Sequence, residues 1–142
     1  MTARRTGFAI AAIATIGLIV ALYLTATKLA GGLPVCGPVE GCEDVARSEY
    51  SAILGIPVAV LGALFSALIA LLGLVWALRA DRRALLGAYG LGLFGLLFVA
   101  YLTYLELFVI HAVCVWCVGY GVTVVVGWLV ALGAVRSSRP PD

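Results

Sequence analysis

The chain has 142 residues, of which 64% are hydrophobic and 11% are charged, and its formal net charge is +2. This charged fraction is far below the roughly 25% of soluble globular domains, and the small net charge gives no indication of nucleic-acid binding. The length fits a single domain. A very hydrophobic soluble helical bundle is the alternative, but no run of the sequence has the polar face that such a bundle needs.

Long stretches without Asp, Glu, Lys or Arg cover residues 6–27, 50–78, 84–105 and 107–135. An apolar helix needs about 20 residues to cross the hydrocarbon core of a bilayer, and the stretches lack the alternation of β-strands. We therefore predict an all-α membrane protein: a four-transmembrane-helix bundle that forms a single membrane domain over residues 1–142, with a short surface helix in the first extracytoplasmic loop.

The first transmembrane helix is expected at about residues 7–29, and its apolar core is too long for a cleaved signal peptide. Residues 31–51 form a long polar loop. Within "CEDVARSEYSAILG", residues 42–55, acidic positions followed by apolar ones predict a short amphipathic helix at the membrane surface. The other transmembrane helices are expected at about residues 57–78, 84–108 and 113–135. Ala88 and Gly92, four apart, favour close helix packing.

Basic residues gather on one side of this predicted bundle. Seven of the nine Lys and Arg residues precede the first helix, join the second to the third, or follow the fourth. The positive-inside rule therefore predicts that both termini are cytoplasmic and that all cysteines are extracytoplasmic. Disulfides persist outside a bacterial-type membrane or in an ER lumen, so the cysteines are candidates for disulfide chemistry.

The four cysteines form two pairs, Cys36 with Cys42 in the polar loop and Cys114 with Cys117 at the start of the fourth helix. A C-x-x-C pair in a first helical turn can close a disulfide, and the N–H groups of the helix end stabilise a thiolate. The turn-prone segment between Cys36 and Cys42 lets one sulfur swing to another partner. Thiol–disulfide exchange would pass electrons from an external protein dithiol to the loop pair and then to the embedded pair.

Such a relay needs an electron acceptor, and a thiol at the lipid boundary can reach a membrane quinone. We expect the quinone ring among the outer ends of the four helices, in contact with Cys117. One or two aromatic residues are expected to contact it, because Trp and Tyr also gather at membrane interfaces without a ligand. The aromatic candidates are Trp116, Tyr120, Tyr101, Tyr104 and Phe108.

These residues resemble the vitamin K epoxide reductase family, specifically its bacterial quinone-reducing homologues without a fused thioredoxin-like domain. The resemblance covers nearly the whole chain. It rests on the two cysteine pairs, on Ser48 six residues after Cys42, and on "YSAILGIP" at residues 50–57. The loop pair precedes the C-x-x-C pair, whereas the DsbB family of quinone-coupled thiol oxidases has the opposite order.

The resemblance implies that Cys114 and Cys117 are the active-site pair, with Cys117 facing the quinone and Cys114 exchanging with a loop cysteine. It implies that Cys36 and Cys42 are the shuttle pair, and that Ser48 holds the surface helix or the active site. The acceptor would be a quinone of the menaquinone, ubiquinone or vitamin K type. The donor would be a separate thioredoxin-fold (DsbA-like) protein that makes disulfides in exported proteins, and the membrane would be a bacterial inner (plasma) membrane.

Two positions differ from the animal members of that family. Those members carry a tyrosine four residues after the second motif cysteine, where this chain has Gly121 beside Tyr120. Ser51 stands about where they carry a quinone-binding asparagine. Both differences favour plain quinone reduction over epoxide reduction. The quinone-binding residues are therefore predicted to be Trp116, Tyr120, Tyr104, Ser48 and Ser51.

Three further polar residues are interpreted as structural. His111 is expected to be an interfacial polar residue rather than a proton shuttle. Glu106 is expected to be an interfacial anchor rather than an acceptor of quinone-linked protons. Lys28 is expected to extend its ammonium to the outer membrane surface. The main alternative function is a metal site made by the four cysteines; the turn-prone loop argues against it, and no metal is expected. A second alternative is a protein with two purely structural disulfides.

Overall fold

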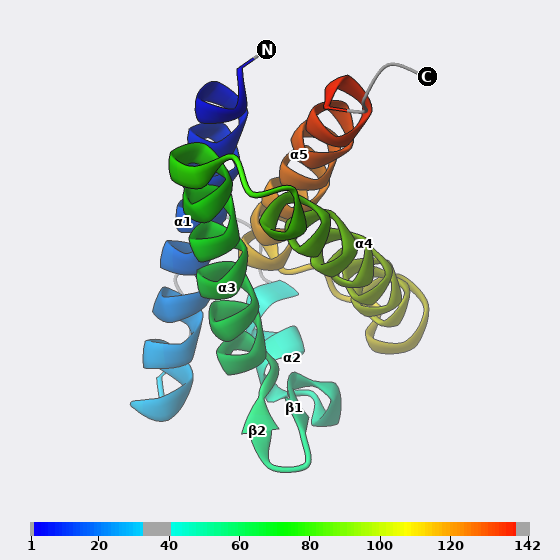
Figure 1. Cartoon of the computed structure of the whole chain (residues 1–142). Coiled ribbons are helices and arrows are strands. Elements are labelled where there is room, and N and C mark those ends of the chain that lie inside the picture. Colours follow the sequence, from blue (N-terminus) through cyan, green and yellow to red (C-terminus); the bar gives the residue numbers. More distant parts are fainter. Residues whose placement is uncertain (1, 33–40, 139–142) are drawn as a thin grey trace.

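The computed structural model describes residues 2–32 and 41–138, and four long helices dominate it (Figure 1). This architecture confirms the predicted all-α four-helix bundle with a short surface helix. The elements in chain order are α1 (Ala3–Leu29), α2 (Gly41–Arg47), the 3-10 turn η1 (Glu49–Ser51), β1 (Ala52–Ile53), β2 (Ile56–Pro57), α3 (Val58–Arg79), α4 (Arg82–Tyr104), the π-helical turn η2 (Leu105–Ile110) and α5 (Val115–Ser137).

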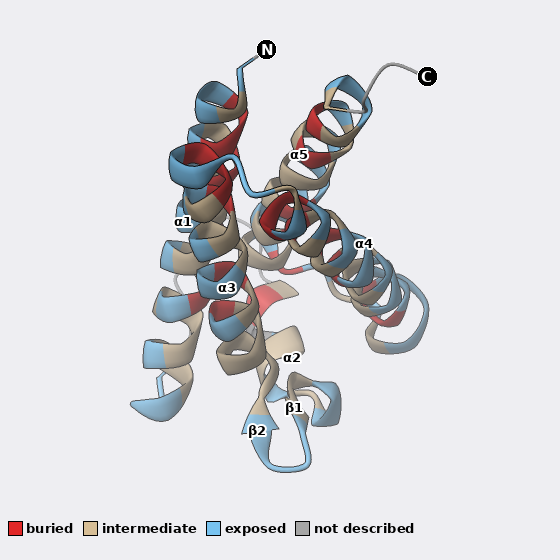
Figure 2. Cartoon of the chain, in the orientation of Figure 1, coloured by how far each residue is buried: buried red, intermediate tan, exposed pale blue. Residues whose placement is uncertain are grey.

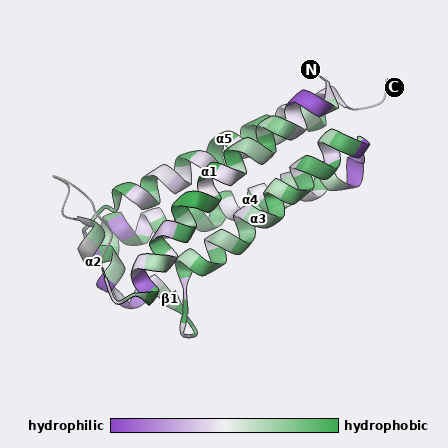
Figure 3. Cartoon of the chain, turned by 90° about the vertical axis from the view of Figure 1, so that its left-hand side faces the viewer, coloured by the Kyte–Doolittle hydropathy of each residue, from purple (hydrophilic) through white to green (hydrophobic). Residues whose placement is uncertain are grey.

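The long helices present apolar side chains outward as well as inward. Ile19, Leu64 and Leu97 are 62%, 65% and 64% exposed, and hydrophilic residues gather at the two ends of the bundle (Figure 3). Four helices, with α4 and η2 counted together, are long and apolar enough to span a membrane. An apolar outer surface of this length is stable in lipid and not in water, so the chain is a multi-pass integral membrane protein.

The tightest helix packing joins α1 to α3. Gly7 lets the two backbones approach closely, because a Cβ there would lie 2.6 Å from the backbone of Gly73 and from Ala77. The indole N–H of Trp76 donates to the Thr6 hydroxyl at 3.1 Å, which satisfies a buried polar group on each helix. Buried residues lie on the facing sides of the helices (Figure 2). This packing joins α1 to α3 at the end of the bundle that carries both termini (Figure 1).

The helix ends differ from the predicted ones by a few residues. α1 begins at Ala3 because the Thr2 hydroxyl caps it by accepting the backbone N–H of Arg5 at 3.4 Å. The third transmembrane helix ends at Ile110, two residues beyond the predicted end, and it changes to π-helical geometry at Leu105. Cys114 is the N-cap residue of α5, so the fourth transmembrane helix starts directly after it.

The surface helix is shorter than the predicted 42–55 segment, because α2 ends at Arg47. The rest of that segment contains the turn η1 and the first strand of a small antiparallel β-hairpin, in which Ile53 pairs with Ile56. Leu54 and Gly55 connect the strands with φ of 53° and 83°. Two consecutive residues at positive φ suit a tight two-residue hairpin turn and cannot continue a right-handed helix.

Candidate active site

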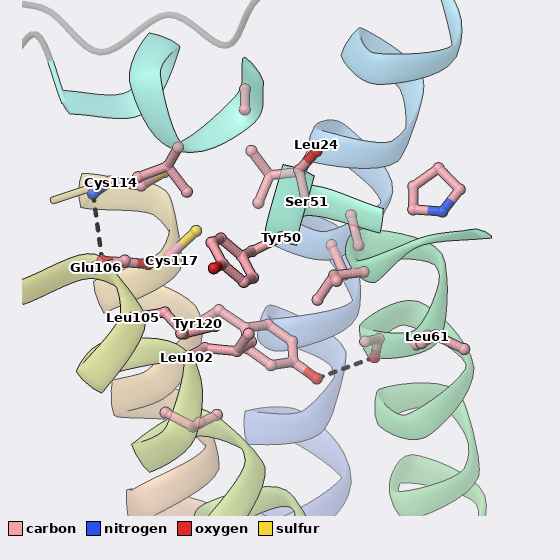
Figure 4. Close-up of a pocket in the computed structure, with 18 of the residues that line it drawn as sticks. Leu24, Tyr50, Ser51, Leu61, Leu102, Leu105, Glu106, Cys114, Cys117 and Tyr120 are labelled. Carbon is pink, nitrogen blue, oxygen red and sulfur yellow. Dashed lines mark hydrogen bonds between the residues drawn. The ribbon is translucent and has the colours of Figure 1, made fainter. Parts of the chain in front are cut away.

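The bundle contains a cavity of about 240 Å³ at the end opposite the two termini (Figures 1 and 4). Its walls are mainly apolar and include Leu24 of α1, Leu61 of α3 and Leu102 of α4. Residues of α2 and η1, among them Val45 and Tyr50, also line it. A mostly apolar cavity with a few polar groups is typical of small-molecule sites.

The C-x-x-C pair lies at the wall of this cavity. Cys114 is 2% exposed, and both Cys114 and Cys117 are free thiols. A hydrogen bond from the Cys117 thiol, helped by the backbone N–H groups of Cys117 and Trp116, lowers the pKa of Cys114 to about 7 despite its burial. A thiol at the N-terminus of a helix is stabilised as a thiolate. Such a lowered pKa is what a thiol needs for thiol–disulfide exchange near neutral pH.

Glu106, in the π-helical turn η2, contacts both cysteines. Its side chain is 6% exposed, and its Oε2 accepts the backbone N–H of Cys114 at 3.4 Å. The Cys117 thiol is hydrogen-bonded to the same carboxylate, and Figure 4 shows the three residues together. The interpretation of Glu106 as an interfacial anchor is therefore wrong, because the carboxylate points inward and contacts the thiol pair.

Cys42 brings the polar loop to the same cavity. It is 1% exposed, lines the cavity and is disulfide-bonded. α2 lies directly on the segment before Cys114, since a Cβ on Gly41 would collide with the backbone of Val113. The first turn of α2 and the start of α5 are thus in contact, which puts a disulfide sulfur near the Cys114 thiol. Cys36 lies outside the described residues.

Ser48 and Ser51 both line the cavity, as predicted quinone-binding residues should. The Ser51 hydroxyl accepts a hydrogen bond from the Lys28 ammonium at 2.7 Å, and the same ammonium donates to the Ala46 carbonyl at 2.6 Å. The Ser48 hydroxyl donates to the Val45 carbonyl at 2.9 Å. Lys28 therefore turns toward the surface segment instead of only snorkelling to water, and it connects α1 to the roof of the cavity.

Tyr120 also lines the cavity, deeper in the bundle (Figure 4). Its hydroxyl donates to the Gly62 carbonyl at 3.0 Å and lies 3.1 Å from the Ser66 hydroxyl. The ring is thereby fixed between α5 and α3. Tyr50, which the sequence did not single out for the site, points its ring into the cavity from η1.

The remaining aromatic candidates lie elsewhere. Trp116 packs its ring against Tyr23, with ring centroids 4.8 Å apart. Tyr104 is 56% exposed and packs against Phe108. The cavity lining contains neither Trp116 nor Tyr104. This placement is the one expected of aromatic residues in a membrane-interface belt.

The chain was compared with known protein families. The model of the vitamin K epoxide reductase family matches residues 8–132, which include all four cysteines. The chain belongs to the vitamin K epoxide reductase family. No curated protein matches it. Vitamin K epoxide reductases are membrane oxidoreductases that combine thiol chemistry with quinones, and an apolar cavity beside a C-x-x-C pair fits that chemistry.

The structure also explains one difference from animal vitamin K epoxide reductases. Gly121 is buried against α4, and a Cβ there would lie 3.0 Å from Cγ1 of Val99. A larger side chain at this position would press on the Val99 side chain, whereas Tyr120 lines the cavity. Among residues 2–32 and 41–138, no group of three or more His, Cys, Asp or Glu side chains could hold a metal ion.

Proposed function

We propose that this protein is a membrane thiol oxidase that reduces a quinone. Electrons would pass from a separate thioredoxin-fold partner through Cys36 and Cys42 to Cys114 and Cys117, and then to the quinone. The observation that carries the proposal is the cavity itself: a single apolar pocket has Cys42, Cys114 and Cys117 in its lining. One small-molecule site thus has both cysteines of the embedded pair and one cysteine of the loop pair in its lining.

The two active-site cysteines differ in a way that supports distinct roles. Cys114 has the lowered pKa and lies beside α2, so it is the sulfur that a loop thiolate attacks and that leaves as a thiolate when the mixed disulfide is resolved. Cys117 lies one helical turn deeper and hydrogen-bonds to Glu106. It is the sulfur that faces the quinone.

The overall reaction is balanced by its two substrates. Oxidation of the Cys114–Cys117 dithiol breaks two S–H bonds and forms one S–S bond, which releases two electrons and two protons. Quinone reduction consumes both and forms two O–H bonds. The embedded pair is then reduced again by the loop pair, and the loop pair by the external dithiol.

The positive-inside distribution supports an orientation with the cysteine end outside the cytoplasm. The termini and the Arg79–Arg83 turn, which carry most of the basic residues, would face the cytoplasm. The partner would then be an exported or membrane-tethered thioredoxin-fold protein that makes disulfides in exported proteins.

The test is turnover by the purified protein with dithiothreitol as donor and short-chain ubiquinone or menaquinone as acceptor. Wild type is expected to reduce at least one quinone faster than dithiothreitol alone does, and Cys117→Ala to fall to that uncatalysed rate. Cys42→Ala is the matched variant: it should keep turnover with dithiothreitol and lose turnover with a reduced thioredoxin-fold protein. Full activity of Cys117→Ala would refute the assignment of the embedded pair.

A further inference from the structure

Glu106 is an acidic side chain placed inside a membrane-spanning segment. It is 6% exposed and belongs to the long apolar span Arg82–Ile110. Ionisable side chains inside membrane-spanning segments are energetically costly, and they usually serve a function. A group kept at this cost is expected to have a function, and its partners indicate which one.

The contacts of Glu106 are made with the redox pair. Its Oε2 accepts the backbone N–H of Cys114, and its carboxylate is one of two acceptors for the Cys117 thiol proton, the Cys114 sulfur being the other. The first contact could be made by any neutral oxygen, because the donor is an amide that does not ionise. The second joins a proton acceptor to an acid whose proton must leave during oxidation. Burial removes bulk water as a ready acceptor for that proton.

Other ionisable residues occur on the elements around the cavity. α5 contributes Cys114, Cys117 and Tyr120, α1 contributes Lys28, and η1 contributes Tyr50, all of which line the same cavity. α2 contributes Asp44 and Arg47, whose side chains are exposed. Of these groups, only the Cys117 thiol is hydrogen-bonded to Glu106 through an ionisable atom, because the Cys114 contact is made by its backbone N–H.

We propose that Glu106 is a catalytic base and acid: it takes the proton of the Cys117 thiol and returns it to an oxygen of the reduced quinone. The inference rests on the proposed quinone-reducing function and assigns a residue to its proton transfer. Geometry carries it, because the carboxylate touches the reacting thiol and lines the cavity in which the quinone would sit.

The proton transfer accounts for every bond that changes. The Cys114 proton first leaves to solvent. The Cys117 S–H bond then breaks, and its proton moves to the Glu106 carboxylate. The S–S bond forms between the two sulfurs, and the released electron pair enters the quinone ring. One quinone oxygen receives the proton held by Glu106 and the other receives a proton from solvent. Glu106 ends as a carboxylate, ready for the next cycle.

Glu106→Gln separates this role from a structural one. The glutamine amide oxygen can still accept the Cys114 N–H, but an amide does not take up a proton from a thiol. Glu49→Gln is the matched control, because it makes the same chemical change at an exposed position of η1. Glu106→Asp keeps the carboxylate on a shorter side chain and should recover part of the activity.

The measurement is single-turnover oxidation of the prereduced protein by short-chain ubiquinone, followed by stopped-flow absorbance. Glu106→Gln should slow quinol formation by about 10²–10⁴-fold, the usual contribution of general acid–base catalysis. Glu49→Gln should match wild type. Above about pH 8, where Cys114 is already ionised, the rate of Glu106→Gln should rise about tenfold per pH unit because hydroxide must remove the Cys117 proton, while the wild-type rate stays flat.

Each outcome separates the two proposals. If wild type itself does not oxidise its dithiol with any quinone, the proposed function fails. If wild type does so and Glu106→Gln has the same rate and the same flat pH profile, the role of Glu106 fails alone. If Glu106→Gln is slow at every pH with no alkaline rise, and Glu106→Asp does not recover activity, Glu106 is structural and the inference is overturned.

Discussion

Replacing Lys28 with methionine should loosen the roof of the cavity. The Lys28 ammonium donates to the Ala46 carbonyl at 2.6 Å and to the Ser51 hydroxyl at 2.7 Å. Ala46 lies in the last turn of α2, where carbonyls have no partner within the helix. A seven-residue helix is too short to be stable alone. The surface segment therefore depends on such ties to α1.

The size of the effect follows from those two bonds. A hydrogen bond from a charged group contributes about 1.5–3 kcal/mol when its partner is removed. Lys28 is only half-buried, so water can replace part of what is lost. We expect the opening free energy of α2 to fall by about 1–2 kcal/mol, which is about a 5- to 30-fold increase in its open population.

Amide hydrogen exchange of the protein in detergent micelles measures this opening directly. Protection of the α2 amides should fall in Lys28→Met, while the middle of α4 keeps its wild-type protection. Leu29→Met, an adjacent substitution at a side chain that is 71% exposed, is the control and should leave α2 unchanged. Equal α2 protection in Lys28→Met and wild type would refute the idea that Lys28 holds the roof.

Two more predictions concern the thiols. The rate at which iodoacetamide alkylates Cys114 in the reduced protein should have its pH midpoint near 7 and should fall below that pH. Cys117→Ala should move this midpoint upward, because it removes the main hydrogen bond to the Cys114 thiolate. An unmoved midpoint would contradict that cause. Gly41→Ala should push α2 away from Val113 and slow electron transfer from the loop pair by about tenfold or more, because sulfur exchange needs direct access. Rapid quenching followed by thiol trapping measures this rate, and an unchanged rate would show that the close approach is unimportant.

Much of the fold could be predicted because membrane spans leave a strong signal. Four runs without acidic or basic residues predicted four helices. Because successive spans alternate in direction, both cysteine-containing segments were expected at the same end of the bundle. The details within the polar segment could not be predicted in the same way. Leu54 adopts a left-handed conformation with φ of 53°, which leucine rarely does, so the hairpin turn was hidden inside an apparently helical sequence.

The site was only partly predictable. Ser48 and Ser51 follow from the resemblance, and both line the cavity, as does Tyr120, which was chosen for its aromatic ring. For Trp116 and Tyr104 the sequence offered only aromatic character, which an interface belt and a ligand pocket share. The ties made by Lys28 join α1 to residues about 20 positions later, a tertiary contact that no local pattern encodes.

The π-helical turn decides where Glu106 points, and this explains why the sequence misled. A π-helical turn holds more residues than an α-helical one, so it shifts the faces on which successive side chains lie. Glu106 is buried, while the next two residues, Leu107 and Phe108, are 50% and 65% exposed. His111 then ends the turn with φ of 57°, which reverses the chain so that the Cys114 N–H donates to the carboxylate.

The sequence pattern around a single glutamate near the end of an apolar run is the same whether the side chain faces lipid headgroups or a thiol. Only the geometry of this turn distinguishes the two orientations of Glu106. Because π-helical turns are frequent at functional sites, the irregular end of α4 supports a functional role for the inward carboxylate.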